Sequence, residues 1–365
     1  CYNEGRNRNE GCFVNCKHRI QRFWDHFMSE RAQLEEALQS GQEDQSEDLI
    51  RELNVRLETI CGCPLFIEYN EDGFFEMTFD TGPNKTVQYI TELMKQCAPK
   101  ELVEDWIINS WLPPFSAKAK NARLRIKDKV YTGADFTVFY EIDDTNRVLH
   151  VSVYCPGFAD IADEERKRDM SAYMLELFLG ELELEARIAS VTAVDKPLSD
   201  SENFCLLPNF YEDVCDIVID REWLEYREPT NIYMAYKINE EGSDDRLRKD
   251  MKLIVTTNSL LQEELLQKNY DSCLDFRDKG GEYGYLYYEN PYEDEKSALI
   301  RQTMEKKIDE LLQPLAIART IGGAIGTRYS YIDVAIFDKD AFAIVLEDLR
   351  SKISFDLRYQ PYLEE

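Results

Sequence analysis

The sequence predicts an α+β fold in which antiparallel sheets carry helices on one face. Short runs that alternate apolar and polar residues, typical of strands, are separated by longer segments whose apolar residues recur every three or four positions, typical of amphipathic helices. The order strand, strand, helix, strand occurs twice between residues 65 and 194. We therefore expect two ββαβ pseudo-repeats, alike in topology and hardly alike in residues, followed by a C-terminal α+β domain.

The first part of the chain predicts a disordered arm and then a helical hairpin. Residues 1–16 are polar and lack periodicity. Apolar stripes predict helices over residues 18–41 and 46–61, joined by a short polar turn. The first ββαβ unit follows, so that residues 17–112 form one expected domain. Its elements are a hairpin over 65–79, a helix over 87–94 and a strand over 106–112.

The second ββαβ unit is expected within residues 113–226, and an alternative is that it forms one domain with the first. Its strands are predicted at 136–142, 148–154 and 187–194, with a helix over 170–178. Turn and breaker residues occupy positions 197–208. The stretch 227–230 is the best linker candidate, because proline follows a charged run there.

The third expected domain spans residues 227–365. Its predicted strands are 232–238, 253–256, 284–288, 329–337 and 353–359, and its predicted helices are 260–266, 295–312 and 341–349. The glycine-rich segment 322–326 lacks the Gly-Lys-Ser/Thr ending of a P-loop. A β-bulge or a close approach between strands is therefore the favoured interpretation.

Charge and composition exclude several classes of function. The 365 residues include 43 Lys and Arg against 71 Asp and Glu, so the net charge is −28. This balance disfavours nucleic-acid binding and favours a basic protein partner. The sequence contains no run of 18 uncharged apolar residues, so no transmembrane helix is predicted. Ten scattered cysteines are typical of reduced thiols in a cytoplasmic protein.

Neither a metal nor a cofactor is expected. Cys12, Cys16, Cys61 and Cys63 could in principle meet around zinc. However, only one residue separates Cys61 from Cys63, which is one fewer than the usual knuckle requires. We therefore expect these cysteines to be buried or unused thiols.

Three passages carry a resemblance to a known family. They are residues 75–111, the segments Tyr154 to Phe158, Leu179 to Glu181 and Lys196 to Leu198 taken together, and residues 322–333. Together they resemble cytoplasmic bacterial proteins of unknown function. The C-terminal domain is similar to a domain associated with the ribonuclease-activity regulator B family. The resemblance implies a ferredoxin-like fold and a regulatory or inhibitory binding role, and it transfers no active-site residues.

The candidate binding residues lie on two strands of the C-terminal domain. Strand alternation places three residues of each strand on one face, with an arginine beside them. These residues are Tyr283, Tyr285, Tyr287, Arg328, Tyr329, Tyr331 and Asp333. Tyrosine and arginine are enriched at the centres of protein interfaces, which favours a binding face. The alternative is that the tyrosines pack beneath helices with their hydroxyls in water.

The leading hypothesis is a cytoplasmic, non-catalytic protein that binds a basic partner, such as a nuclease or a toxin. No His-Glu-x-x-His motif, Gly-x-Ser-x-Gly elbow or Cys/His catalytic signature is present. One alternative is a hydrolase or transferase with a site between domains. Another is a surface lipoprotein anchored at Cys1, the first residue of the sequence. An exposed sheet edge would also allow a homodimer.

Overall fold

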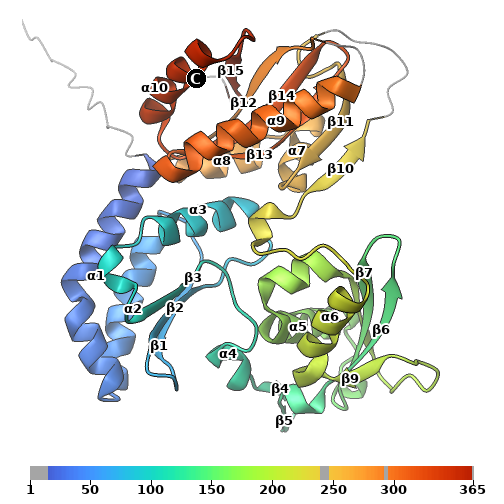
Figure 1. Cartoon of the computed structure of the whole chain (residues 1–365). Coiled ribbons are helices and arrows are strands. Elements are labelled where there is room, and N and C mark those ends of the chain that lie inside the picture. Colours follow the sequence, from blue (N-terminus) through green and yellow to red (C-terminus); the bar gives the residue numbers. More distant parts are fainter. Residues whose placement is uncertain (1–14, 239–245, 292–294, 364–365) are drawn as a thin grey trace, which may run out of the picture. The chain divides into compact units, whose positions relative to one another are not determined.

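The structure, a computed structural model, describes residues 15–238, 246–291 and 295–363. It has the α+β class that the sequence predicts. The chain divides into two compact units (Figure 1). The central unit comprises residues 29–233, and the C-terminal unit combines residues 234–365 with the beginning of the chain up to residue 28. Helix α1 (Cys16–Gln39) therefore contributes residues to both units.

The first ββαβ unit of the central unit is confirmed. Strands β1 and β2 form an antiparallel hairpin, and β3 pairs in parallel with β2 after the crossover helix α3. The elements of this part are α2 (Glu43–Leu57), β1 (Leu65–Tyr69), β2 (Phe75–Phe79), α3 (Lys85–Gln96) and β3 (Trp106–Asn109). Asn84 caps α3 by accepting a hydrogen bond from the Val87 N–H.

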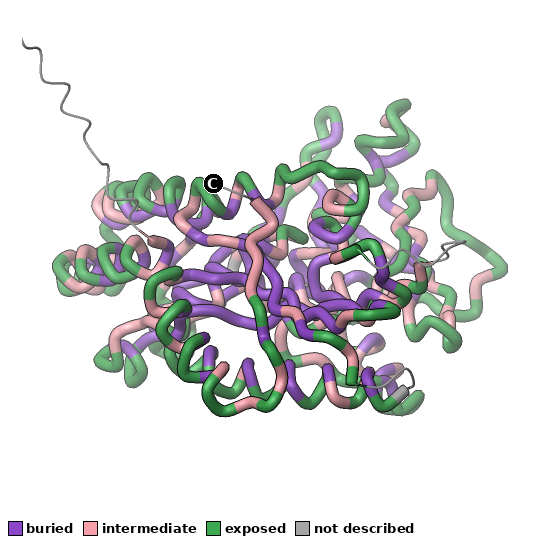
Figure 2. Tube along the Cα trace, turned by 90° about the horizontal axis from the view of Figure 1, so that it is seen from above, coloured by how far each residue is buried: buried purple, intermediate pink, exposed green. Residues whose placement is uncertain are grey.

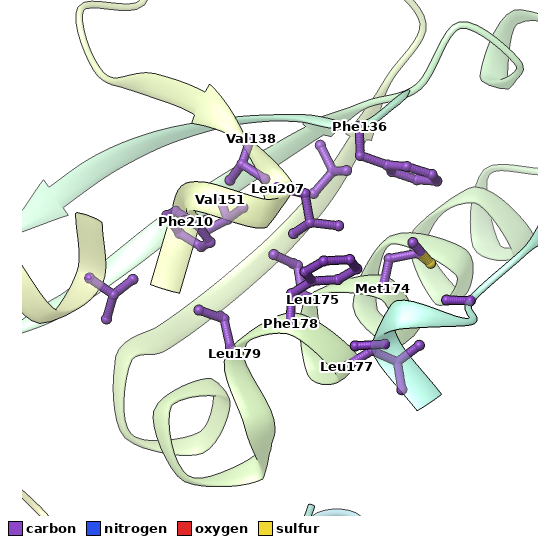
Figure 3. Packing of buried hydrophobic residues seen from close by; sticks show 14 of the residues in the cluster. Phe136, Val138, Val151, Met174, Leu175, Leu177, Phe178, Leu179, Leu207 and Phe210 are labelled. Atoms are coloured by element: carbon purple, nitrogen blue, oxygen red, sulfur yellow. The ribbon is translucent and has the colours of Figure 1, made fainter. Parts of the chain in front are cut away.

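The second ββαβ unit is also confirmed, and it forms a four-stranded sheet in the order β8-β7-β6-β9. Its elements are β6 (Thr137–Asp143), β7 (Val148–Tyr154), α5 (Glu164–Arg187), β8 (Ile188–Val194) and β9 (Phe204–Leu206). Figure 3 shows Met174, Leu175 and Phe178 of α5 pointing toward Val138 and Val151 of the sheet. These buried side chains belong to a core on one face of the sheet.

Several predictions for the central unit are wrong. The sheets were expected to be antiparallel, but each ββαβ unit contains one parallel pair of strands. The reason is that a helical crossover returns the chain to the same end of the sheet. Helix α6 (Phe210–Asp220) follows the expected breaker region, which itself contains β9. Short elements α4 (Ala117–Lys120), β4 (Leu124–Ile126) and β5 (Lys129–Tyr131) were not predicted. Strand β3 ends at Asn109, three residues earlier than expected.

The predicted linker 227–230 is a packed segment. Pro229 begins a short 3-10 helix (Pro229–Asn231), and Thr230 is fully buried. The Lys85 ammonium donates a hydrogen bond of 2.6 Å to the Pro229 carbonyl. The division between the units falls a few residues later, between Tyr233 and Met234.

The C-terminal unit contains the predicted ferredoxin-like arrangement. The run β12-α9-β13-β14-α10-β15 has the order βαββαβ, and its strands lie side by side as β13-β14-β12-β15 with every pair antiparallel. Strands β11 and β10 extend the sheet beyond β13. The strands are β10 (Met234–Lys237), β11 (Met251–Thr256), β12 (Glu282–Glu289), β13 (Ala318–Gly326), β14 (Tyr329–Ile336) and β15 (Arg358–Pro361).

Helices pack against both faces of this sheet, which corrects the expectation of one covered face. The helices of the unit are α7 (Ser259–Gln267), α8 (Asp271–Asp278), α9 (Glu295–Leu312) and α10 (Lys339–Lys352). Helices α9 and α10 cover the face that carries Leu286, Ile332 and Val334. On the opposite face, Phe276 of α8 packs against Tyr283 with ring centroids 4.5 Å apart. Helix α8 was not predicted.

The glycine-rich segment is the central strand β13, and its predicted bulge is confirmed between Thr320 and Gly322. Gly322 has φ +121°, and a Cβ there would lie 2.1 Å from the Val255 carbonyl oxygen. The strands approach closely at this point because glycine has no side chain. Figure 2 shows buried positions mainly along the inner, extended stretches of the trace and exposed positions mainly on its outer coils and loops. No helix of the described residues is long and apolar enough to cross a membrane.

Candidate functional site

The candidate site is a buried network around Arg248 on the tyrosine-bearing face of the C-terminal sheet. Arg248 Nη1 lies 2.7 Å from Asp333 Oδ1, and Nη2 donates to Gln262 Oε1 at 3.1 Å. Gln262 Nε2 in turn donates to Asp333 Oδ2 at 2.8 Å, and Tyr362 donates to Oδ1 at 2.7 Å. Asp333 is fully buried, so three neighbours replace the water that its carboxylate loses.

Three aromatic rings enclose the guanidinium of Arg248. Its Cζ lies 5.1 Å from the ring centroid of Tyr285, 5.3 Å from that of Tyr331 and 5.2 Å from that of Tyr362. These distances are typical of cation–π contacts, which strengthen as water is removed. Arg248 has φ +62°, an uncommon left-handed conformation for a residue with a side chain. The backbone thus brings this arginine over the sheet from the turn before β11.

Asp250 ties the same turn to the neighbouring strand. Tyr331 donates a hydrogen bond of 2.5 Å to Asp250 Oδ1, and its hydroxyl accepts one from the Arg248 N–H at 2.8 Å. Asp250 Oδ2 accepts from the N–H groups of Arg328 and Tyr329 at 2.9 and 2.8 Å. Burial, followed by the hydrogen bond to Asp250, raises the pKa of Tyr331 well above its usual value. The phenol therefore stays protonated and acts as a donor.

The structure brings together only part of the predicted binding face. Tyr285, Tyr331 and Asp333 belong to the Arg248 network, and Tyr283 lies under α8. These four residues are buried, so the exposure expected of a docking surface is wrong for them. The physical reason is that α7, α8 and the turn at residues 246–250 cover this face. The alternation of residues along the two strands is as predicted.

The other three predicted residues lie toward the edge of the same face. Tyr287 and Tyr329 are half-buried and pack edge-on, with centroids 5.8 Å apart. Arg328 is exposed, pairs with Glu289 at 2.7 Å and lies over the ring of Tyr329. The arginine that pairs with Asp333 is thus Arg248, whereas Arg328 pairs with Glu289.

A pocket of about 510 Å³ opens beside the network. Tyr285, Tyr362 and Leu265 contribute apolar surface, and Arg248, Lys249 and Lys268 are its charged lining residues. None of the described residues that line it is an aspartate or a glutamate. The volume falls within the range of small-molecule sites. A pocket whose described lining contains cations and no acids is unexpected in a protein of net charge −28.

Sequence reasoning missed Arg248, Gln262 and Tyr362. Arg248 lies in a run of alternating charges that is typical of a solvated turn. Its partner Asp333 is 85 residues away, and Gln262 is 71 residues from the same carboxylate. The only local signal was Asp333 itself, an acid between the aliphatic residues of a strand otherwise suited to a core.

A second cluster of acids lies in the central unit. Carboxylate oxygens of Asp80, Glu176 and Glu181 are within 4.8 Å of one another, as ligands of a divalent cation would be. Lys118 pairs with Asp80, and Glu181 accepts hydrogen bonds from Thr81 and Gly82. Burial is the largest cause that raises the pKa of Glu181 to about 7, and these hydrogen bonds oppose it. Protein groups thus already bind two of the three carboxylates.

The structure shows where the cysteines of the considered zinc site lie. Cys61 and Cys63 are buried with their sulfur atoms 3.3 Å apart, and their mutual hydrogen bond raises the pKa of Cys63. Cys16 begins α1 in the C-terminal unit, so it belongs to a different unit from this pair. Cys12 and nearly all of the predicted arm lie outside the described residues.

Comparisons of the chain with protein families, with curated proteins and with solved structures find no match. The resemblance to the family associated with ribonuclease-activity regulator B therefore stays a prediction. What is known of the site comes from its own geometry.

Proposed function

We propose that the chain is a non-catalytic binding protein whose C-terminal unit binds an anionic small molecule with an apolar part. The pocket beside Arg248 carries the proposal, because the charged residues of its described lining are all cations. Asp333 neutralises Arg248 from inside the fold. Lys249 and Lys268 are exposed, and no ion pair joins either of them to another residue within the described ranges. Their charges are therefore available to a ligand.

The remaining lining residues favour an amphiphilic anion over a bare ion. Tyrosine rings and the side chains of Leu265, Leu266 and Met251 provide apolar contact area. The Arg248 network supports the pocket by holding Tyr285 and Tyr362 in place. Such preorganisation lowers the entropic cost of binding. The proposed ligand class is thus a carboxylate, sulfate or phosphate attached to an aromatic or aliphatic group.

Calorimetric titration with two matched probes tests this proposal. Naphthalenesulfonate should bind, and neutral naphthalenemethanol should bind about fivefold more weakly, since two exposed lysines contribute about 1 kcal/mol together. Replacing Lys249 and Lys268 by glutamine should abolish the difference between the probes. The control variant replaces Lys237 and Lys252, two exposed lysines outside the pocket, and should leave both affinities unchanged.

Three outcomes would contradict the proposal. The sulfonate could fail to bind, the two probes could bind equally well, or the control variant could weaken the sulfonate as much as the pocket variant does. The last outcome would assign binding to the general electrostatic field. Because all four lysines are exposed, the variants should retain the thermal stability of the parent protein.

A further inference from the structure

The central unit presents a second hollow with different chemistry. A groove of about 630 Å³ lies on the four-stranded sheet, on the face opposite the core formed by α5 and α6. Residues of β6, β7 and β8 form its floor, and the segment 197–203 forms one wall. Glu141, Asp200 and Glu202 are its charged lining residues, and none of the described lining residues is a lysine or an arginine.

Part of the groove floor is formed by polar side chains that pair across strands. His150 Nδ1 lies 2.8 Å from Ser190 Oγ, and Ser152 Oγ lies 2.8 Å from Thr192 Oγ1. Glu141 is directly opposite His150 in the register of β6 and β7. Both pairs have the same distance and join directly opposite residues of β7 and β8. The His150–Ser190 contact is therefore an ordinary cross-strand pair on an exposed sheet face. Each pair retains lone pairs that can accept a hydrogen bond from a ligand.

Apolar residues lie along the same groove. Phe139 is part of the floor, Pro197 and Leu198 are part of the wall, and the Leu198 side chain is 41% exposed. Next to the groove, Phe204 packs against Phe139 with centroids 5.8 Å apart and is itself 60% exposed. Apolar area next to carboxylates and hydroxyls is typical of surfaces that bind other proteins.

We infer that this groove is a docking site for an extended, lysine- or arginine-rich segment of a protein partner. Charge complementarity selects the occupant, because the three carboxylates all lie at exposed positions of one groove. Long basic side chains can reach these carboxylates while their methylene groups cover Leu198 and Phe204. Backbone N–H groups of the segment can donate to the paired hydroxyls of the floor. The site is independent of the anion pocket in the C-terminal unit.

Fluorescence polarisation with a labelled heptapeptide of alternating lysine and threonine tests the inference. The measurement uses the full chain at about 0.15 M salt, where charges separated by more than about 8 Å are largely screened. The groove variant carries Glu141→Gln, Asp200→Asn and Glu202→Gln. It should bind the peptide at least about tenfold more weakly than the parent protein, because three ionic contacts are lost.

The matched control removes three other exposed acids of the central unit, by Asp72→Asn, Glu101→Gln and Glu104→Gln. Both variants change the net charge equally, so only the position of the charges differs. The control should lose less than about twofold in affinity. Equal losses in the two variants would overturn the inference in favour of the general field of the protein. Failure of the parent protein to bind the lysine peptide more tightly than its glutamine analogue would overturn it as well.

Discussion

In each unit, helices cover one face of the sheet: α5 and α6 in the central unit, and α9 and α10 in the C-terminal unit. The two units differ in what lies on the opposite face. In the C-terminal unit that face bears large aromatic residues and Asp333, and α7, α8 and the Arg248 turn cover it. In the central unit the corresponding face bears His150, Ser152 and Thr192, and the groove leaves it open. Both patterns alternate apolar with polar residues, so alternation alone does not reveal which polar face is buried. The covered face is distinguished by its large tyrosine side chains and by Asp333, whose carboxylate is paired and hydrogen-bonded.

Among the changes that test this difference between the two faces, replacing Asp333 should lower the free energy of unfolding the most. Asp333→Asn leaves the buried guanidinium of Arg248 without a counter-charge, which should lower the free energy of unfolding by about 3 to 5 kcal/mol. Urea unfolding followed by circular dichroism measures the loss. The matched change on the open face, Glu141→Gln, should cost less than about 0.5 kcal/mol.

A second variant distinguishes lost charge pairing from lost packing. Replacing both partners, by Arg248→Met and Asp333→Leu, should be less destabilising than Asp333→Asn alone, because no buried charge is left unpaired. If Asp333→Asn cost less than about 1 kcal/mol, the network would be hydrated and the contrast between the two faces would fail.

Glu181, a buried acid of the central unit, should make the stability of the protein depend on pH. The Glu181 carboxylate accepts hydrogen bonds from the hydroxyl and N–H of Thr81 and from the N–H of Gly82. Burial raises the pKa of Glu181 to about 7. The folded protein therefore binds this proton more tightly than the unfolded chain, so its stabilising effect is greatest below pH of about 4.5 and is lost as pH rises toward 7.

The loss expected from Glu181 is up to about 3 kcal/mol between these pH values, and Glu181→Gln should remove this part of the pH dependence. Unfolding midpoints in urea measured at several pH values between them test this expectation. Glu101→Gln, at an exposed position of the same unit, should leave the pH profile unchanged. A Glu181→Gln profile parallel to that of the parent protein would show that Glu181 does not cause the dependence.

Local patterns were sufficient to predict most of the framework. The ββαβ units follow from apolar periodicity, which acts through neighbours in sequence. The ferredoxin-like arrangement was expected only from the family resemblance. Alternation also placed Tyr285, Tyr331 and Asp333 on one face. Their burial could not be predicted, because Arg248 and Gln262 reach Asp333 from distant positions in the chain. Helix α6, which follows the expected breaker region, was not predicted.

The candidate site depends on the left-handed backbone conformation of Arg248, which sequence patterns do not reveal. A charged run containing Arg248 has the composition of a solvated turn, yet its left-handed residue directs that side chain into the fold. The acid cluster of the central unit arises in a similar way, since Asp80 and Glu181 are 101 positions apart in the chain. Tertiary packing alone brings these groups together.

The smallest expected effects come from removing one hydroxyl on each face. Tyr331→Phe deletes a buried group that donates to Asp250 and accepts from the Arg248 N–H, so it should cost about 1 to 3 kcal/mol. Ser152→Ala deletes a hydroxyl of similar partner distance on the open face, where water can replace it. This change should cost less than about 0.5 kcal/mol. Denaturant unfolding of both variants measures the difference. Equal costs would show that the two polar faces are equally hydrated, and the distinction between a covered network and an open groove would then be wrong.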